Sequence, residues 1–349
     1  MTELLDKLAC THSLSLSEYE TLINGFTPDI AEYAATLSRK VREDIYGNRV
    51  FIRGLVEISN ICKNDCYYCG IRRSNSDCQR YRLSKEEILS CCENGYALGF
   101  RTFVFQGGED AFFSDSFLVP LIEQIKKLYP DCAVTLSLGE RSKESYIALK
   151  NAGADRYLLR HETIDEKHYS LLHPDSMSHS YRLECLETLR SIGFQVGCGF
   201  MVGSPFQTKE MLARELKFIE NFKPDMCGIG PFIPHKSTRF CDEKAGSVYL
   251  TLFLLSLIRL IHPTVLLPAT TALNTLSETG RKDGIMAGAN VVMPNLSPVS
   301  ARKKYTLYDN KKISGNESAE ELEALRLELL SINHTVVVDR GDVERKHND

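Results

Sequence analysis

The pattern of hydrophobic and polar positions changes near residue 48. Before that point, apolar residues recur at helical spacing in residues 16–24 and 29–47, which predicts amphipathic helices. After it, short apolar runs rich in branched residues alternate with longer segments of helical periodicity. Runs of the first kind are typical of buried strands, and segments of the second kind are typical of the helices that cover them.

Eight such apolar runs follow one another along the chain, with helix-like segments between and after them. The runs span residues 50–59, 102–109, 133–140, 156–163, 195–204, 226–234, 264–272 and 290–298. The helix-like segments span residues 84–99, 116–130, 142–153, 178–193, 208–222, 247–261, 277–289 and 318–332. The first of these opens with Ser84 and Glu87 in a capping-box pattern. A strand followed by a helix, repeated in this way, predicts an α/β fold of the (β/α)8 TIM-barrel type, with an open doubly wound sheet as the alternative.

The connections between these segments are short, so we expect one domain over residues 1–349. Residues 1–48 then form an N-terminal helical layer and residues 49–310 form the barrel. Residues 311–349 form a short C-terminal extension, a helix and a tail. We expect the charged end of this tail, residues 339–349, to be frayed.

Composition excludes several classes of function. The chain is 43% hydrophobic, enough for a large core, and its net charge of −4 arises from interspersed charges, so no nucleic-acid binding is expected. The longest apolar run, residues 249–261, contains Arg259 and is too short to span a membrane; it fits a buried helix. No secretory pattern opens the chain, so the twelve cysteines are expected to be thiols, metal ligands or core residues in the cytoplasm.

Polar or small residues gather where the predicted strands end. These stretches read SNIC, QGGED, SLGE, RHET, GSP, PATTA and MPN. In a TIM barrel the carboxyl ends of all strands open at the same mouth, where active sites lie. The sequence therefore predicts chemistry at one mouth of the barrel.

Three cysteines, Cys62, Cys66 and Cys69, lie in the stretch CKNDCYYC directly after the first predicted strand. A lone cysteine is usually a small core residue, but three beside charged residues of a loop do not fit a core. A structural zinc site needs four ligands, and Cys78 is the candidate that would complete it. An iron–sulfur cubane held by three thiolates instead leaves one iron open to a small ligand that carries an amine and a carboxylate.

The Cys-x3-Cys-x2-Cys spacing, with two tyrosines before the last cysteine, resembles that of radical S-adenosylmethionine (SAM) enzymes. The resemblance implies that Cys62, Cys66 and Cys69 hold one 4Fe–4S cluster whose unique iron binds SAM. In that superfamily one electron from the cluster cleaves the sulfonium and generates a 5′-deoxyadenosyl radical. A non-catalytic barrel stabilised by zinc or by a cluster is the alternative from outside the enzymes.

Further SAM contacts are implied by the same resemblance. A Gly-Gly-Glu at the end of the second strand contacts the SAM ammonium in that superfamily, and the matching glutamate here is Glu109. Arg160 and Glu162 would point to the same side of an alternating strand, either to bind carboxylates and ribose hydroxyls or as a structural ion pair. The residues expected to bind SAM are Tyr68, Gln106, Gly108, Glu109, Glu162, Arg182 and Met201. Each of these contacts has another interpretation. The QGGED stretch could be a simple turn, Arg182 could lie on a solvated helix face, and Met201 could only pack within its strand.

Residues near the later strand ends are candidates to line a closed, dry lumen, as a radical enzyme requires. Tyr305 and Tyr308 are spaced to share a helix face, and core packing is the alternative for both. The residues expected to line the inner cavity and contact the substrate are Arg160, Thr270, Thr271, Met293, Tyr305 and Tyr308.

The resemblance narrows to the HydE family of FeFe-hydrogenase maturases, over about residues 40 to 310. The runs that carry it are QGGED, SLGE, RYLLRHET, CGIGPFIPH, PATTA and GANVVMPN. It implies action on an organometallic substrate, an iron–cysteine carbonyl–cyanide complex made by HydG, in assembly of the di-iron subcluster, with transfer of the product to HydF. It also implies a reducing electron donor and no membrane partner. Methylornithine synthase and biotin synthase belong to the same group and are the alternatives.

Two departures from the family pattern bear on these expectations. Some HydE proteins bind a second cluster through cysteines near the C-terminus, but this chain has no cysteine after Cys241, so one cluster is expected. Gly107 stands where some relatives have serine, which puts in doubt a role for a hydroxyl there. Cys198 and Cys227 fall in predicted strands and are expected to be core residues rather than ligands of a lumen cluster.

Overall fold

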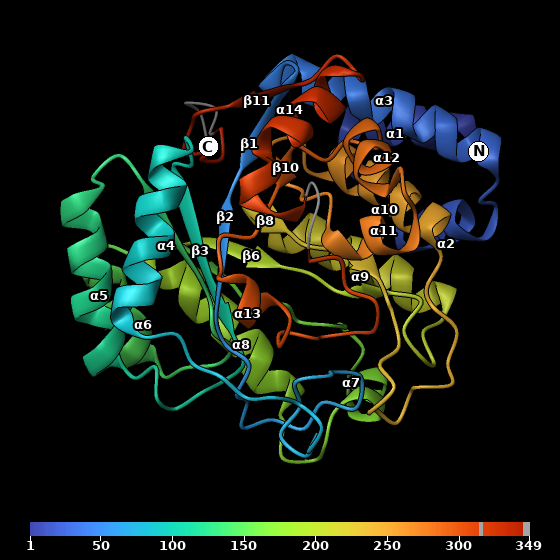
Figure 1. Ribbon diagram of the computed structural model, residues 1–349. Helices are drawn as coiled ribbons and strands as arrows, with labels where there is room; N and C mark the ends of the chain where they lie inside the picture. Colours follow the sequence, from blue (N-terminus) through green and yellow to red (C-terminus); the bar gives the residue numbers. More distant parts are fainter. Residues whose placement is uncertain (314–316, 345–349) are drawn as a thin grey trace.

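The computed structural model describes residues 1–313 and 317–344, and its centre is a parallel sheet (Figure 1). The sheet has six strands in the order β2-β3-β4-β5-β6-β8, and every neighbouring pair is parallel. These strands are β2 (Gly54–Ser59), β3 (Thr102–Gly107), β4 (Ala133–Ser137), β5 (Arg156–Leu158), β6 (Gln195–Cys198) and β8 (Met226–Cys227).

Isolated parallel bridges close this sheet into a ring. Met226 bridges to Leu266, Pro268 bridges to Val291 in β10 (Val291–Val292), and Asn295 bridges to Leu55 in β2. The predicted run at residues 264–272 therefore occupies its place in the ring without forming a regular strand. The (β/α)8 barrel is confirmed, and an open doubly wound sheet is wrong because the first strand meets the last segment.

The first predicted run, residues 50–59, divides into two strands at Arg53. β1 (Arg49–Ile52) pairs with β10 of the ring on one side and with β11 (Thr335–Val337) on the other, whereas β2 pairs with β3. Different partners on the two sides of Arg53 thus break one apolar run into two elements. Beyond β6 and β8 the chain continues into a short parallel pair, β7 (Met201–Val202) and β9 (Gly230–Pro231).

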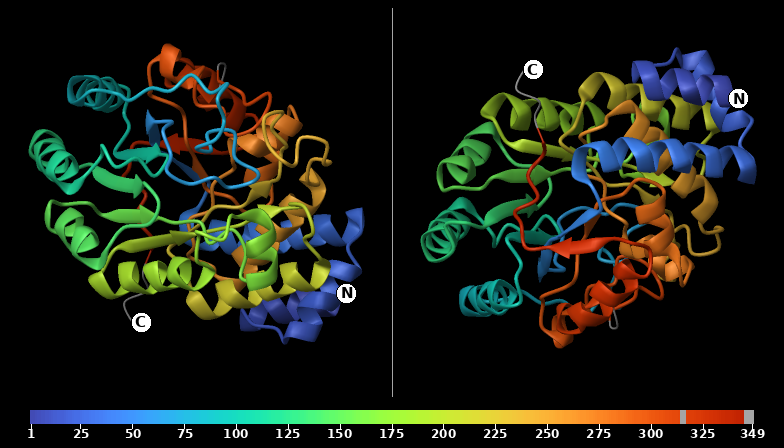
Figure 2. Two further views of the ribbon diagram at one scale, coloured as in Figure 1. Left: turned by 90° about the horizontal axis from the view of Figure 1, so that it is seen from below. Right: turned by 90° about the horizontal axis from the view of Figure 1, so that it is seen from above.

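Helices surround the strands on the outside, as both views in Figure 2 show. The predicted capping box of the first barrel helix is present, since Ser84 accepts a hydrogen bond from the Glu87 backbone and Glu87 accepts one from Ser84. The predicted barrel helices are α4 (Lys85–Ala97), α5 (Asp115–Leu128), α6 (Lys143–Asn151), α8 (His179–Ile192), α9 (Lys209–Phe222), α10 (Val248–Ile261), α12 (Gly280–Met286) and α14 (Leu322–Leu330). Shorter elements that the periodicity did not predict are α7 (Glu166–Leu172), α11 (Thr271–Leu276) and α13 (Val299–Arg302), and the predicted segment 318–332 begins with a 3-10 turn, η2 (Ala319–Glu321).

The expected N-terminal layer consists of α1 (Thr2–Thr11), α2 (Leu16–Asn24) and α3 (Pro28–Tyr46). α3 packs along α10, and α2 packs on α9. α10 is therefore covered both by the barrel and by the N-terminal helices, which explains why it is apolar on nearly every side. Its single charge, Arg259, is fully buried and donates hydrogen bonds to the carbonyl oxygens of Gly288 and Pro263.

The C-terminal segment crosses the barrel end opposite to the predicted mouth (Figure 2, right). The expectation of a frayed end is wrong for residues 339–344, because Arg156 is fully buried and binds both the Arg340 carbonyl oxygen (2.8 Å) and the Asp342 carboxylate (2.5 Å). Strand β11, which precedes them, was not predicted. Residues 345–349 lie outside the described part of the chain.

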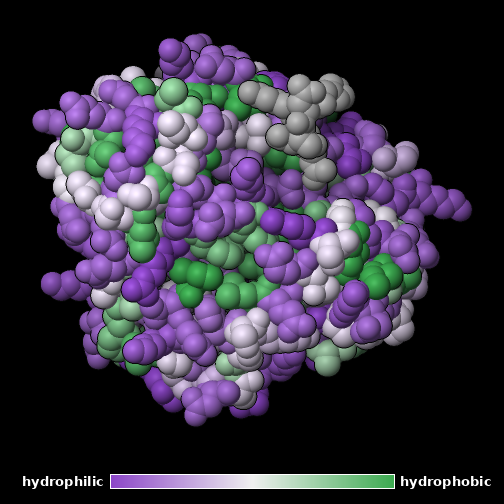
Figure 3. All heavy atoms as spheres, turned by 180° about the vertical axis from the view of Figure 1, so that it is seen from behind, coloured by the Kyte–Doolittle hydropathy of each residue, from purple (hydrophilic) through white to green (hydrophobic). Residues whose placement is uncertain are grey.

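Among residues 1–313 and 317–344, no helix has the length and apolarity needed to cross a membrane. On the face seen from behind, hydrophilic residues cover most of the surface and hydrophobic residues form separate patches (Figure 3).

The ion pair between Arg156 and Asp342 predicts a stability that depends on pH. Burial alone would raise the pKa of Asp342, but the Arg156 guanidinium outweighs this effect and lowers that pKa to about 2. A carboxyl with a lowered pKa stabilises the fold above its unfolded-state pKa and loses this effect as pH falls through the folded value. Because Asp342 is partly exposed, we expect Asp342→Asn to lower the free energy of unfolding by only about 1 kcal/mol at pH 7. The deficit should shrink between about pH 4 and pH 2.

Urea denaturation of both proteins across this pH range measures the effect. Asp131→Asn is the matched control, since Asp131 forms an exposed pair with Arg101 (2.8 Å), and its loss should stay within about 0.5 kcal/mol. A deficit for Asp342→Asn that is constant with pH would contradict the assigned role of its charge.

Candidate active site

The three cysteines lie in the loop between β2 and α4, across the mouth formed by the carboxyl ends of the strands (Figure 2, left). Arg80 fixes this loop from within, because its guanidinium donates to the carbonyl oxygens of Asn60 (2.6 Å), Ile71 (2.7 Å) and Arg72 (2.5 Å). A loop held through its own carbonyl groups can present side chains with defined geometry.

The thiols of Cys62, Cys66 and Cys69 act on one another electrostatically. Burial raises the pKa of all three thiols, that of Cys69 to about 12, and the other cysteines of the group add to the rise for Cys66 and Cys69. Thiols with raised pKa values need a metal to hold them as thiolates.

The donor set fits a multi-iron cluster better than one zinc ion. Within the described ranges, no three His, Cys, Asp or Glu side chains are close enough together to hold a single metal ion. Cys78, the candidate fourth zinc ligand, instead receives a hydrogen bond from Asn60 (3.5 Å). A cubane spans a wider triangle of thiolates than one ion does, and it is ligated by cysteine.

The QGGED turn after β3 touches the cysteine loop directly. The Glu109 backbone N–H donates to the Cys62 sulfur (3.4 Å), and the Lys63 N–H donates to the Glu109 carbonyl oxygen (3.0 Å). A side chain at Gly108 would place its Cβ 2.3 Å from the Ile61 carbonyl oxygen and 2.7 Å from the Cys62 Cβ. Glycine at this position therefore allows the turn and the cysteine loop to meet.

Arg182 is the centre of an ion network beside this turn. Its guanidinium lies 2.7 Å from Glu140 and 3.7 Å from Glu109, and Lys63 lies 3.1 Å from the second oxygen of Glu109. Burial alone would lower the pKa of Arg182, but Glu140, Tyr169 and Glu109 raise it above its usual value. Burial also raises the pKa of Glu140. The interpretation of Arg182 as a solvated helix residue is wrong, because its side chain is 10% exposed.

Glu140 was not singled out from the sequence, although it ends the stretch SLGE at a strand end. Position at the mouth was the signal that could have identified it. The network now holds charges of both signs, as recognition of a zwitterion requires.

Arg160 and Glu162 form an ion pair of 3.1 Å. They meet for a different reason from the strand alternation expected, because β5 ends at Leu158 and Glu162 has a left-handed backbone with φ of 66°. Burial and the two neighbouring cysteines are the main causes of the raised pKa of Cys66, and the charge of Glu162 adds to the rise. The Glu162 carboxylate therefore lies within electrostatic reach of the cysteine group.

Tyr68 and Met201 belong to one apolar cluster beside the cysteines, together with Leu172 and Phe232. The Tyr68 hydroxyl lies 3.2 Å from Nε2 of His173, whose Nδ1 lies 3.0 Å from a backbone carbonyl oxygen and must therefore carry the proton. Burial lowers the pKa of His173 to about 3, so the neutral ring accepts the Tyr68 hydrogen bond. His173 had no motif around it and was missed.

Gln106 donates to the Tyr305 hydroxyl (3.3 Å). Glu57 pairs with Gln106 in the β2–β3 register, which places both side chains on the same face of the sheet. Lys311 reaches this position, because it forms an ion pair with Glu57, which is fully buried, and donates to the Tyr305 carbonyl oxygen (3.1 Å). Glu57 and Lys311 were also missed, since the chain brings them together from distant positions.

The expected helix face shared by Tyr305 and Tyr308 is wrong, because α13 ends at Arg302. Tyr305 is nonetheless fully buried, whereas Tyr308 is half-buried and has a pKa that burial raises. Tyr305 therefore reaches the interior from a turn instead of from a helix, and Tyr308 lines a groove together with His235 and Lys311.

The other three candidates for the inner cavity lie on the α11 side. Thr271 and Met293 line a cavity of about 10 Å³ together with Arg281 and Glu317, and the Thr271 hydroxyl donates to Glu317 (2.7 Å). Thr270 precedes α11, and its hydroxyl is buried without a hydrogen-bond partner among the described residues.

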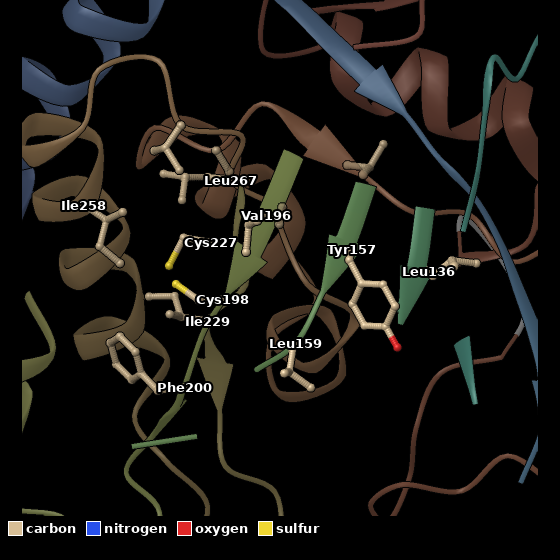
Figure 4. Packing of buried hydrophobic residues seen from close by; sticks show 14 of the residues in the cluster. Leu136, Tyr157, Leu159, Val196, Cys198, Phe200, Cys227, Ile229, Ile258 and Leu267 are labelled. Carbon is tan, nitrogen blue, oxygen red and sulfur yellow. The ribbon is translucent and has the colours of Figure 1, made fainter. Parts of the chain in front are cut away.

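Cys198 and Cys227 face away from this site. They are register partners in β6 and β8, and Figure 4 shows their sulfur atoms side by side, directed toward Ile258 of α10. Both are fully buried in the main apolar core. The structure therefore confirms them as core residues, and they cannot ligate a cluster in the lumen from this position.

Comparison with known proteins agrees with this geometry. Residues 56–219 match the family model of the Radical SAM superfamily. The chain is 43% identical to the [FeFe] hydrogenase maturase subunit HydE of Thermotoga maritima over 275 residues, which cover 79% of this chain and 78% of that protein. It is 27% identical to 3-methylornithine synthase of Methanosarcina acetivorans over 307 residues, which cover 87% and 86% of the two chains. Enzymes of this superfamily use a 4Fe–4S cluster and SAM.

Solved structures show the same fold. A methylornithine synthase (PylB) superimposes with a TM-score of 0.81 over 96% of this chain and 97% of its own, at 24% identity. The hydrogenase maturase HydG superimposes with a TM-score of 0.80 over 95% of this chain and 74% of its own, at 21% identity. Since the identity to HydE extends over more than two thirds of both chains, and the Radical SAM match includes the cysteine loop, the chain belongs to the HydE family of radical SAM enzymes.

Proposed function

We propose that this enzyme acts in the assembly of the di-iron site of [FeFe]-hydrogenases, on an iron–cysteine carbonyl–cyanide precursor. The observation that carries the proposal is the convergence of the three thiols, the QGGED turn and the Arg182 network at one mouth of the barrel. When bound, the cluster supplies the electron that cleaves SAM to a 5′-deoxyadenosyl radical. The protein's part is to bind and orient SAM and to keep the substrate away from water.

The amino-acid end of SAM carries a carboxylate and an ammonium, and the site offers a partner for each. Arg182 binds the carboxylate through its planar fork, in place of part of its contact with Glu140. Glu109 binds the ammonium, in place of Lys63. Glu162 is available for the ribose hydroxyls, and Tyr68 and Met201 provide apolar surface for the adenine.

The substrate occupies the lumen beyond SAM. Arg160 attracts an anionic ligand, and Thr270, Thr271 and Met293 line the wall on the far side. Tyr305 lies between the SAM site and the substrate lumen. Its hydroxyl accepts a hydrogen bond from Gln106, and the Lys311 ammonium lies 4.8 Å from the centre of its ring. A lumen closed by such side chains excludes water from a reactive radical.

The proposal includes partners and a location. HydG supplies the substrate, HydF receives the product, and a reducing protein supplies the electron. None of the twelve cysteines forms a disulfide, which supports a location in the cytoplasm.

Maturation in vitro tests the function. Purified apo-hydrogenase, HydG and HydF are incubated with SAM and a reductant, with or without this protein. We expect hydrogenase activity to depend on the protein, because without it the precursor is not converted. Formation of methylornithine from lysine, with no gain of hydrogenase activity, would instead assign the chain to the chemistry of its other relatives.

Removal of one cysteine of the loop should abolish cluster binding and leave the fold intact. We expect Cys66→Ala to retain less than about one-tenth of the wild-type iron after anaerobic reconstitution, since two thiolates do not hold a cubane. Its circular dichroism should be unchanged, because the loop lies outside the core. Cys10→Ala and Cys241→Ala, at exposed cysteines, are the controls and should bind iron normally. Normal iron content in Cys66→Ala would refute the ligand role.

Arg182→Lys tests the carboxylate contact. Lysine keeps the charge but loses the planar fork, so we expect SAM binding to weaken by about 2 kcal/mol, roughly 30-fold. Calorimetric titration of the cluster-loaded protein with SAM measures this. Arg101→Lys, at an arginine paired with Asp131 outside the mouth, is the matched control. Equal affinity of Arg182→Lys and wild type would place the SAM carboxylate elsewhere.

A further inference from the structure

The backbone at Glu162 is held in a conformation that glutamate does not favour. Its φ of 66° lies in the left-handed region, which costs energy for a residue with a Cβ. Such a conformation persists only where the surrounding structure fixes it. The contacts on both sides of Glu162 show what fixes it here.

A buried pair, His161 and Glu215, makes these contacts. Both side chains are fully buried, and Nε2 of His161 lies 2.7 Å from one carboxylate oxygen of Glu215. The other oxygen of Glu215 accepts the backbone N–H of Ile164 (2.7 Å). Glu215 lies on α9, so one carboxylate ties the segment on both sides of Glu162 to a barrel helix.

The His161 ring extends this brace to the neighbouring segment. The Gly199 N–H donates to Nδ1 of His161 (3.3 Å), so the proton of the neutral ring is on Nε2 and points to Glu215. The Glu162 N–H in turn donates to the Gly199 carbonyl oxygen (3.0 Å). Gly199 is therefore held by His161 and itself holds Glu162.

Burial of a carboxylate away from water is costly unless hydrogen bonds satisfy it. In the described part of the chain, the Glu215 carboxylate meets no arginine or lysine, and its partners are the neutral His161 ring, which packs against Phe218 at 4.7 Å, and the Ile164 N–H. An apolar pair would fill this space without that cost. A carboxylate at this position is explained by its two directed hydrogen bonds, from His161 and from the Ile164 N–H, which an apolar side chain could not form.

We propose that Glu215 and His161 are positioning residues for SAM binding: they hold the Glu162 backbone in its left-handed form and so aim its carboxylate at the mouth. The inference rests on the proposed function, in which Glu162 contacts SAM. Without the brace, residues 160–164 relax toward a more extended form, and the carboxylate turns from the position beside Arg160 and the cysteines.

SAM binding to the cluster-loaded protein tests the proposal without recourse to turnover. We expect Glu215→Ala to weaken SAM binding at least about tenfold, which corresponds to 1.4 kcal/mol, at unchanged iron content. Glu215→Gln retains an amide oxygen for one of the two bonds, so its loss should be smaller, about threefold. The change that SAM produces in the electron paramagnetic resonance spectrum of the reduced cluster gives the dissociation constant.

Glu220→Ala is the matched control on the same helix. Glu220 is also a partly buried carboxylate with directed bonds, to Tyr19 (2.6 Å) and Ser13 (2.7 Å), but these tie α9 to the N-terminal layer. It should lower the melting temperature and leave SAM affinity within about twofold of the wild type. A similar loss of affinity in Glu220→Ala would show that α9 acts through general stability, and would overturn the proposal.

A double-mutant cycle separates positioning from a structural effect. If Glu215 acts through Glu162, then Glu215→Ala should add little to the loss already caused by Glu162→Gln. Additive losses overturn the proposal, as does wild-type affinity in both Glu215 variants. If Glu215→Ala does not fold, Glu215→Gln decides. Absence of SAM binding to the wild-type protein would overturn the proposed function, whereas normal wild-type binding with unaffected variants overturns this inference alone.

Discussion

The contact between the QGGED turn and the cysteine loop is the constraint on which the rest of the site depends. The chain can bring the two segments together only because Gly108 has no side chain where Ile61 and Cys62 pass. The same contact lets the Glu109 backbone donate to a cysteine sulfur and places its carboxylate beside Arg182. The proposed metal ligands and the proposed SAM-binding charges are thus coupled through one turn of backbone.

The mouth is a place where charge is balanced and partly buried. Arg182 lies within ion-pair distance of Glu109 and Glu140, which offsets part of the cost of holding these charges out of water. Even so, Arg182 Nε and one oxygen each of Glu109 and Glu140 are buried without a hydrogen-bond partner among the described residues. A zwitterionic ligand carries both a carboxylate and an ammonium, and can therefore supply the hydrogen bonds that these atoms lack. A second buried ion pair, between Glu57 and Lys311, lies next to Tyr305.

The position of each cysteine in the barrel distinguishes the buried core cysteines from those proposed to bind the cluster. The loop thiols lie at the mouth, whereas Cys198 and Cys227 lie on the outer side of the strands against α10. A lumen cluster of the kind considered for biotin-synthase-like enzymes has no ligands at these two positions. The cysteine loop at the mouth is the site to which we assign the metal chemistry.

The sequence by itself determined the barrel, the order of its elements and the cysteine site, because hydrophobic periodicity and short-range motifs are local properties of the chain. It did not determine that residues 50–59 divide at Arg53, that β11 and Asp342 close the far end, or that Tyr305 lies in a turn. These features arise from partners distant in sequence. Glu140, Lys311 and the pair of His161 and Glu215 were hidden for the same reason, since a charged residue reveals its role only when the fold supplies the group that it meets.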